Sequence, residues 1–413
     1  KHWVEGNQDV DDKTYVAGDE VHGNVSMTLP EPEQLAKPLS KIIVIDDYRN
    51  FMDKVTYEGA NVYEGDKDVT SLYDVKNENG IVTATRKDAS SAPGGIVYLK
   101  ANWKLNTAIP NGTVLTNRGL GQINDDLVPT PDRNIYVFTQ TAEKHWKAGD
   151  QDVDSKTVIN DDVIHSEVSM SLPEPNSLAK SLEDVEIEDD YSDFKDKVGL
   201  PTVKLYENGQ DASAEYNVTL KDGVITAVRK DPSKAPAGTL TMNVTWKVNH
   251  DVASGTKFTN KGTGIINRSR VKTNTPDVVT FTPETDKHWT NDNDQSVDNM
   301  VFIAGDNVSS KVSMSLPEPQ NLAEKLKKVQ VIDNFADFAD KVDLKGYSIT
   351  ENGKDANDLY NFEVTKDHQI IATRKDPATT PGGLVILRAQ WTLHKDVPTG
   401  TVLTNKGSGH YLN

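Results

Sequence analysis

Apolar and polar side chains alternate along most of the chain, and this alternation predicts β-strands. The segments VHGNVSMTL and HSEVSMSL place Val, Met and Leu on one face of an extended chain. IVTATR, VITAVR and IIATR are rich in β-branched residues and begin after turn-forming residues. GGIVYLKANWKL and AGTLTMNVTWKV predict longer strands. Only LPEPEQLAKPL and ADFADKV favour a short helical turn.

One pattern of strands and turns is repeated three times along the 413 residues. The tripeptide KHW stands at 1–3, 144–146 and 287–289. Each copy then carries a VSM strand, an LPEP turn, an RKD strand end and a GTVLTN or GTKFTN segment. The repeat has the length of a whole domain, whereas a solenoid unit usually has about 20–50 residues.

The chain is therefore predicted to be all-β, with three tandem antiparallel β-sandwiches of a variant immunoglobulin-like type. Their predicted boundaries are 1–140, 141–283 and 284–413. Segments such as NIYVFTQTAEKHW contain little Gly or Ser, so we expect short and stiff joints. The third copy has no such segment after GTVLTN, which leaves open whether it has its last strand.

Each copy also places an acidic residue on a buried strand face. Residues two apart in an extended strand share a face. In IIVIDDY, Asp46 shares a face with Ile42 and Val44, whereas the second aspartate points to the other face. The same phase selects Asp46, Asp189 and Asp333.

A lysine and an asparagine follow the same logic. The lysine of KHW shares a strand face with a tryptophan, and the last residue of GTVLTN shares a face with a leucine or phenylalanine. These residues are Lys1, Lys144 and Lys287, with Asn117, Asn260 and Asn405. First and last strands of a sandwich often pair or lie close, so these side chains are expected to meet the buried aspartate.

A buried Lys, Asp and Asn can react with one another. Desolvation lowers the pKa of a lysine and raises the pKa of a carboxyl, so the amine becomes a nucleophile and the acid can polarise the Asn amide. Attack with loss of ammonia gives a Lys–Asn isopeptide bond. By analogy with a disulfide, closing a loop of about 116 residues adds roughly 4–5 kcal/mol. The alternative is that these residues only pack or satisfy backbone groups, because duplication copies every residue.

The composition restricts the partners. The formal net charge of −18 argues against nucleic acid or an anionic membrane as a general partner, and no apolar run is long enough to span a membrane. The chain contains no cysteine, which excludes disulfides, thiol catalysis and Cys-ligated zinc. It has no initiator Met and no signal peptide, so we expect an excised fragment.

Other candidate sites give weaker patterns. The acidic loops NQDVDDK, DQDVDSK and DNDQSVDN lack the spacing of an EF-hand loop, so solvated turns are favoured; calcium is left open, and no other metal or cofactor is expected. The basic pairs Arg86–Lys87, Arg229–Lys230 and Arg374–Lys375 recur at strand ends, where an edge-strand gatekeeper is favoured over a ligand patch. The repeats contain no Ser-His-Asp or glycosidase-like constellation, so an enzyme that turns over substrate is not expected.

Together these motifs resemble one family. A Lys at the domain start, a DDY-like segment and a TN strand that leads into the next Lys are similar to the C-terminal domains of Gram-positive cell-wall adhesins of the antigen I/II type. KHW, LPEPxxLAK and GTxLTN are most similar to the enterococcal aggregation-substance branch. The resemblance implies a stalk of immunoglobulin-like domains with Lys–Asn isopeptide bonds that the aspartate promotes.

The predicted function is therefore the stalk of a cell-surface adhesin, which presents an N-terminal adhesin head for cell aggregation, conjugation, biofilm formation and host attachment. Its expected partners are the rest of the adhesin chain and surface molecules of host or partner cells. The alternative is that the repeated domains bind such molecules themselves. In either case we expect a secreted, wall-anchored protein whose anchor and signal peptide lie outside this sequence.

Overall fold

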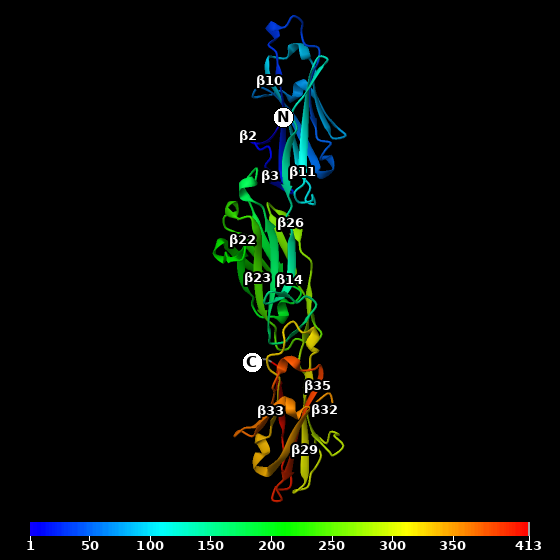
Figure 1. The fold of residues 1–413 in the computed structure, drawn as a ribbon, viewed down its shortest axis with the longest axis vertical. Coiled ribbons are helices and arrows are strands. Elements are labelled where there is room, and N and C mark those ends of the chain that lie inside the picture. Colours follow the sequence, from blue (N-terminus) through cyan, green and yellow to red (C-terminus); the bar gives the residue numbers. More distant parts are fainter. Residues whose placement is uncertain (412–413) are drawn as a thin grey trace.

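The computed structural model describes residues 1–411, which form an elongated rod of β-sheets (Figure 1). The sheets fall into three groups that follow one another along the chain and along the rod; we name them the first, second and third repeat. Each repeat encloses its own cluster of buried apolar side chains. The predicted all-β sandwich fold is confirmed, whereas the domain boundaries stay a prediction. No helix in residues 1–411 is long and apolar enough to cross a membrane.

The first repeat has two sheets. One has the strand order β2 (Gln8–Asp9), β1 (His2–Glu5), β4 (Glu20–Leu29), β10 (Gly95–Leu105), β6 (Val55–Glu64), β7 (Lys67–Asp68). The other has the order β3 (Thr14–Val16), β13 (Arg133–Phe138), β11 (Val114–Ile123), β5 (Ile42–Asp47), β9 (Ile81–Arg86), β8 (Tyr73–Glu78), with β12 (Asp126–Pro129) beside β11. Strand β3 pairs with β13 in parallel, and the other pairs are antiparallel.

The second repeat has the same arrangement, with its second layer interrupted at one point. The continuous sheet has the order β15 (Gln151–Asp152), β14 (Ala142–Ala148), β17 (Val163–Leu172), β23 (Gly238–Lys247), β19 (Thr202–Glu207), β20 (Gln210–Asp211). The opposite layer consists of two sheets. One has the order β16 (Thr157–Ile159), β27 (Asp277–Phe281), β24 (Lys257–Thr259), and the other has the order β21 (Tyr216–Lys221), β22 (Val224–Arg229), β18 (Val185–Asp190), β25 (Lys261–Ile266), β26 (Ser269–Lys272). The interruption lies at Asn260, between β24 and β25.

The third repeat has a smaller second sheet. Its first sheet has the order β28 (Thr285–Thr290), β29 (Asn307–Leu316), β35 (Gly383–Leu393), β31 (Val342–Glu351), β32 (Lys354–Asp355). Its second sheet has the order β33 (Tyr360–Val364), β34 (Gln369–Arg374), β30 (Gln330–Asn334), β36 (Lys406–His410). Within residues 1–411 this repeat has no counterpart of β3, β13 or the first half of β11, so one side of its second sheet is open.

Short 3-10 helices connect many of the strands. They are η1 (Pro32–Gln34), η2 (Met52–Lys54), η3 (Thr70–Leu72), η4 (Ala89–Ser91), η5 (Pro175–Ser177), η6 (Lys195–Lys197), η7 (Ser213–Glu215), η8 (Pro232–Lys234), η9 (Pro319–Asn321), η10 (Ala336–Lys341), η11 (Asn357–Leu359), η12 (Pro377–Thr379). The helical turns predicted at LPEP and at ADFADKV correspond to η1 and η10. Proline opens η1, η5 and η9, where its fixed φ suits the first helical position.

The LPEP loops of the second and third repeats contact the repeat before them. The backbone N–H of Ala179 donates to the carbonyl of Thr14 at 2.9 Å, beside a parallel bridge between Thr14 and Leu178. The next joint is built in the same way, because Ala323 donates to Thr157 at 2.8 Å. Neighbouring repeats are therefore held by direct backbone contacts in addition to the connecting strand.

Each joint also contains an apolar contact. Val16 lies at the end of β3 in the first repeat, yet it packs with the apolar cluster of the second repeat and is 2% exposed. Ile159 has the same position in the second repeat and packs with the cluster of the third. One apolar side chain from each of these repeats is therefore buried in the next.

Candidate functional site: a buried lysine, aspartate and asparagine in each repeat

The predicted site residues come from opposite layers of each sandwich. Lys144 lies on β14 in the first sheet, whereas Asp189 lies on β18 and Asn260 lies between β24 and β25 in the opposite layer. In the first repeat Asp46 faces Gly119 across the β5–β11 ladder, two residues from Asn117. The strand of the lysine and the strand of the asparagine therefore face each other across the core, and they are not paired neighbours in one sheet.

The lysine and the aspartate of each repeat are in direct contact. Lys1 Nζ donates to Asp46 Oδ2 at 2.5 Å, and Lys287 Nζ donates to Asp333 Oδ2 at 2.5 Å. Lys144 Nζ contacts Asp189 in the same way. Both side chains are 0% exposed in the first two repeats, whereas Lys287 is 16% exposed. The phase argument from the sequence thus placed the lysines and aspartates on the correct faces.

Burial changes the protonation of these groups. Desolvation lowers the pKa of Lys1, Lys144 and Lys287, although the neighbouring aspartate opposes this shift. Desolvation also raises the pKa of Asp46 and Asp189, against the attraction of the lysine. The enclosed pair therefore favours a neutral amine beside a neutral acid, compared with the same groups in water.

The asparagines have unsatisfied amides. Asn117 and Asn260 are fully buried, and within residues 1–411 neither side-chain atom of either residue meets a partner at hydrogen-bond geometry. Asn117 lies close enough to Asp46 to favour its charged form slightly. Among these described residues, the second oxygen of Asp46 and of Asp189 has no partner either. An unpaired buried polar group costs about 1–3 kcal/mol, so this cluster needs an explanation beyond packing.

A serine that the sequence reasoning missed completes two of the three sites. Ser166 accepts from Lys144 Nζ at 2.9 Å and donates to Asp189 Oδ2 at 3.1 Å. Ser310 makes the same contacts in the third repeat and also accepts from Asn405 Nδ2 at 3.1 Å. The signal was present, because Ser166 has the same strand phase as Val168 and Met170.

In the first repeat a glycine takes the position of this serine. A Cβ atom at Gly23 would lie 2.8 Å from Lys1 Nζ and 3.1 Å from Asn117 Nδ2. The amine and the amide therefore face the same small space. Gly23 lets them approach without an intervening hydroxyl.

Aromatic rings form the apolar wall of the site. Lys1 Nζ lies 6.0 Å and 5.9 Å from the ring centroids of Trp3 and Trp103. The indole N–H of Trp3 donates to the carbonyl of Arg133 at 3.0 Å, at the start of β13. The rings exclude water from the amine, which is the physical origin of its lowered pKa.

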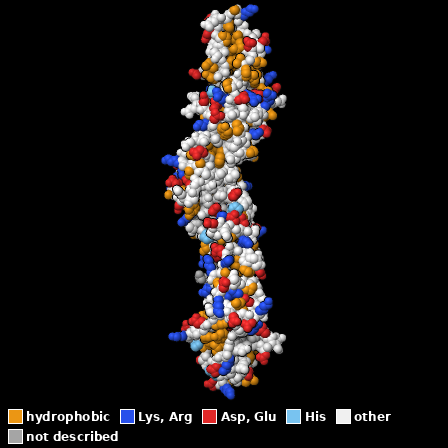
Figure 2. Space-filling model, viewed as in Figure 1, with side chains coloured by type: hydrophobic (Ala, Val, Ile, Leu, Met, Phe, Trp, Pro, Cys, Tyr) orange, Lys and Arg blue, Asp and Glu red, His pale blue; other side chains and the backbone are white. Residues whose placement is uncertain are grey.

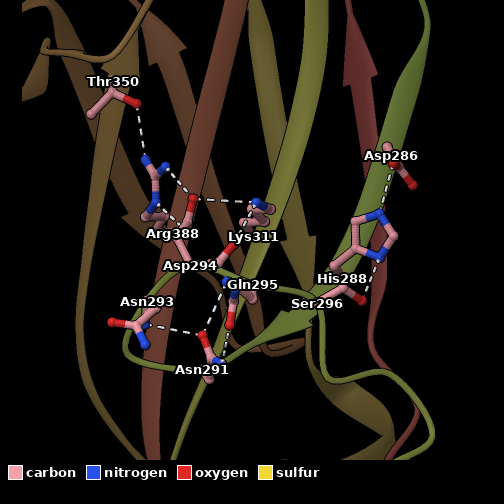
Figure 3. A network of polar contacts seen from close by, with 10 residues as sticks. All are labelled: Asp286, His288, Asn291, Asn293, Asp294, Gln295, Ser296, Lys311, Thr350 and Arg388. Carbon is pink, nitrogen blue, oxygen red and sulfur yellow. Dashed lines mark hydrogen bonds and ion pairs between the residues drawn. The ribbon is translucent and has the colours of Figure 1, made fainter.

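The acidic loops hold the KHW strand in place. Asp154 accepts from the backbone N–H of Trp146 and contacts His145 Nδ1, both at 2.7 Å. In the third repeat Asp294 binds Lys311 and Arg388, as Figure 3 shows. Several carboxylates of these loops are thus used by protein donors. Among residues 1–411 no group of three or more His, Cys, Asp or Glu side chains is arranged to hold a metal ion.

The arginine of each recurring basic pair is buried, so its interpretation as an edge-strand gatekeeper was wrong, whereas the lysine of each pair is exposed. Arg229 donates to Glu207 at 2.7 Å and 3.2 Å, and Tyr216 donates to the same carboxylate at 2.9 Å. Arg86 and Arg374 make equivalent networks. Each network ties the end of one sheet to the other, because the glutamate and the arginine lie in opposite layers.

The fold and the repeated buried cluster define a class of protein: tandem immunoglobulin-like β-sandwiches with a polar group enclosed between the sheets. The sequence profile of the cell surface antigen I/II C2 terminal domain family matches residues 3–122 and 139–278. The chain belongs to this family. It is an adhesin-type segment, and its family points to an extracellular or cell-surface location.

Solved structures share this fold at low sequence identity. The C-terminal domain of the Streptococcus pyogenes antigen I/II-family protein AspA is 14% identical, with a TM-score of 0.56, over 68% of this chain and 98% of that chain. The C-terminal domain of the Streptococcus agalactiae antigen I/II polypeptide BspA is 13% identical, with a TM-score of 0.54, over 67% of this chain and 98% of that chain. No curated protein matches the sequence.

Proposed function

We propose that this chain is a stalk segment of a cell-wall-anchored adhesin, and that Lys–Asn isopeptide bonds cross-link its sandwiches. The observation that carries the proposal is the enclosed cluster of Lys144, Asp189 and Asn260, in which the lysine pKa is lowered and the asparagine amide has no hydrogen-bond partner within residues 1–411. If these residues only packed together, their polar groups would stay buried without hydrogen-bond partners, which costs free energy. A covalent amide would remove the amine and consume the free Asn amide.

The reaction needs no cofactor. The neutral amine of Lys144 attacks Cγ of Asn260, while protonated Asp189 donates to the amide oxygen and stabilises the charge that develops there. Asp189 then shuttles a proton from the attacking nitrogen to the leaving nitrogen. One C–N bond forms, one C–N bond breaks, and ammonia leaves. Each site reacts once, so the chain is not proposed to turn over a substrate.

The joints support a role as a stalk. Each of the two joints buries one apolar side chain of the preceding repeat and contains one backbone hydrogen bond from the LPEP loop of the following repeat. The repeats therefore stack end to end (Figure 1). Such joints resist bending better than a flexible linker would. Acidic and basic side chains are scattered along the visible face of the rod (Figure 2), which suits a solvated spacer.

The biological setting follows from the resemblance to aggregation substance. We propose that the stalk presents an N-terminal adhesin head for cell aggregation, conjugation, biofilm formation and host attachment. Its partners would then be the rest of the adhesin and surface molecules of host or partner cells. Deleting the three repeats within the parent protein should reduce cell aggregation while the isolated head still binds its ligand.

The intact mass of the purified chain in denaturant tests the covalent chemistry. We expect a deficit of about 34 Da from the two fully enclosed triads and about 51 Da where the third also closes, because each bond releases one ammonia of about 17 Da. Each deficit is measured against the mass calculated from the sequence of the same variant. In Asp189→Ala the deficit should be about 17 Da smaller than in the wild type, whereas Asp190→Ala, on the opposite face of the same strand, should leave the deficit unchanged. If the measured mass of the wild-type chain equals the mass calculated from its sequence, the isopeptide proposal is rejected.

A further inference from the structure

A buried serine hydroxyl contacts all three reacting side chains of the third repeat. Ser310 is 0% exposed on β29, and its Oγ accepts from Lys287 Nζ at 2.9 Å and from Asn405 Nδ2 at 3.1 Å. The same hydroxyl donates to Asp333 Oδ2 at 2.9 Å. In the isopeptide reaction Nζ is the attacking nitrogen and Nδ2 is the leaving nitrogen. One oxygen atom therefore contacts both nitrogens and the acid.

The second repeat places a serine at the same strand position, in a site that is closed to solvent. Ser166 is 1% exposed and stands two residues before the valine of VSM, as Ser310 does. Its Oγ also accepts from the lysine amine and donates to Oδ2 of the aspartate. The contacts of the serine with the amine and the acid are therefore built twice, in two repeats with different surrounding sequences.

The first repeat shows independently where this strand position points. Gly23 stands two residues before the valine of VSM there. A Cβ atom on this glycine would lie 2.8 Å from Lys1 Nζ and 3.1 Å from Asn117 Nδ2. A side chain at this position is therefore directed between the attacking and the leaving nitrogen in the first repeat as well.

The leaving nitrogen needs a proton, and the contacts of the third repeat show a route for it. After the attack, Nζ has one proton to lose and Nδ2 has one proton to gain before ammonia can leave. Asp333 Oδ2 contacts Lys287 Nζ and Ser310 Oγ. Within the described part of the chain, Asn405 Nδ2 donates to Ser310 Oγ and to no oxygen of the aspartate. The route from the acid to the leaving nitrogen thus passes through the hydroxyl.

We propose that Ser166 and Ser310 are catalytic residues of isopeptide formation, which pass a proton from the aspartate to the leaving nitrogen of the asparagine. The aspartate Oδ2 takes a proton from Nζ and gives one to the serine Oγ, while the hydroxyl proton moves from Oγ to Nδ2. The Nζ–Cγ bond forms, the Cγ–Nδ2 bond breaks, ammonia leaves, and the serine keeps a hydroxyl. This inference rests on the proposed Lys–Asn bond and adds the residue that completes its proton transfer.

The rate of cross-linking in newly made full chain tests this role. Chain from a short pulse of cell-free synthesis is diluted into buffer, quenched in denaturant at intervals and digested, and mass spectrometry of the cross-linked peptides follows each repeat separately. We expect Ser166→Ala to slow closure of the second repeat about 10- to 100-fold, because a positioned proton donor contributes about 10²–10⁴-fold and the aspartate is still present. The first repeat of the same chain should close at its wild-type rate.

Matched variants separate proton transfer from an effect on packing or on charge. Ser169→Ala removes a hydroxyl from the opposite face of the same strand and should leave the rate unchanged. Ser166→Gly, which copies the first repeat, should slow closure as Ser166→Ala does, and it serves as the test if the alanine variant fails to fold. The slowing should be equal from pH 6 to pH 9, because a serine hydroxyl does not titrate in this range.

Three results would overturn the role of the serine, and they can be told apart. A wild-type chain that forms no cross-link rejects the isopeptide bond and the serine together. A wild-type chain that closes, with Ser166→Ala and Ser166→Gly closing equally fast, rejects the serine alone. A slower rate that returns to the wild-type maximum at another pH would show that Ser166 acts only through the pKa of Lys144 or Asp189.

Discussion

The environment of a single side chain decides what each repeated residue can do. Lys144 and Lys287 stand at the same position of KHW, but the first is fully enclosed and the second is 16% exposed. The serine beside them is replaced by Gly23 in the first repeat. The same repeated residues therefore form three sites that differ in polarity and in solvent exposure.

The buried arginine gives a prediction at this scale. Replacing Arg229 by Met leaves the carboxylate of Glu207 buried without its cation, so we expect the free energy of unfolding to fall by about 3–5 kcal/mol. Chemical denaturation of the full chain, followed by a probe in the second repeat, measures this loss. The neighbouring Lys230→Met changes an exposed side chain and should cost less than about 0.5 kcal/mol. Equal losses for the two variants would contradict the proposed role of the ion pair.

The sequence predicted much of the site at the scale of residues. The alternation of each strand placed Lys1, Asp46 and Asn117 on inward faces without any structure. It could not show that Arg86 is buried, because a charged residue at a strand end is usually exposed and only the glutamate from the other sheet makes burial favourable. Glu64 lies 22 positions away, and no local pattern links the two residues.

At the scale of elements, each KHW strand is fixed by the acidic loop that follows it. His145 and the backbone of Trp146 both contact Asp154. The same loops pin the strand that carries the lysine. The strands themselves were predictable from alternation, but the partner of each strand was not.

The stability that this contact between the KHW strand and the acidic loop provides should depend on pH, because the contact includes His145. The hydrogen bond with Asp154 raises the pKa of His145, so the protonated form stabilises the folded state. This contribution is complete below the unfolded pKa of about 6.5 and is lost as the pH rises through the higher folded pKa. His145→Gln should therefore reduce stability at pH 5.5 to 6 more than at pH 9. Because the ring is partly exposed, we expect a difference of about 0.5 kcal/mol.

Thermal unfolding of the wild type and of His145→Gln, at pH 5.5 to 6 and at pH 9, measures this difference in stability. His165→Gln is a suitable control, because His165 contacts the hydroxyl of Thr245 and no carboxylate accepts from that nitrogen within residues 1–411. A loss for His145→Gln that is independent of pH would show that the histidine acts through packing alone.

At the scale of the whole molecule, the joints turn separate sandwiches into one rod. Val16 is the clearest example, because it belongs to the first repeat by sequence and to the second by packing. Besides the connecting strand, Val16 and the LPEP loop therefore contact the neighbouring repeat.

A joint variant tests this coupling. Val16→Ala removes about two methyl groups from the core of the second repeat, so we expect that repeat to lose about 2 kcal/mol of stability although the change lies in the first. Val10→Ala, within the core of the first repeat, should leave the second unaffected. Hydrogen exchange resolved by repeat measures both effects. Unchanged exchange in the second repeat of Val16→Ala would show that the joint is only a contact.

The sequence by itself determined the strands, the inward faces and the threefold repetition, because alternation and turn residues act over a few positions. Only the tertiary structure decided which strands pair, that Lys and Asn face each other across the core, and that Val16 and Ile159 pack in the following repeat. These contacts join residues far apart along the chain. Their free energy comes from burial that exists only after the two sheets and the neighbouring repeats have met.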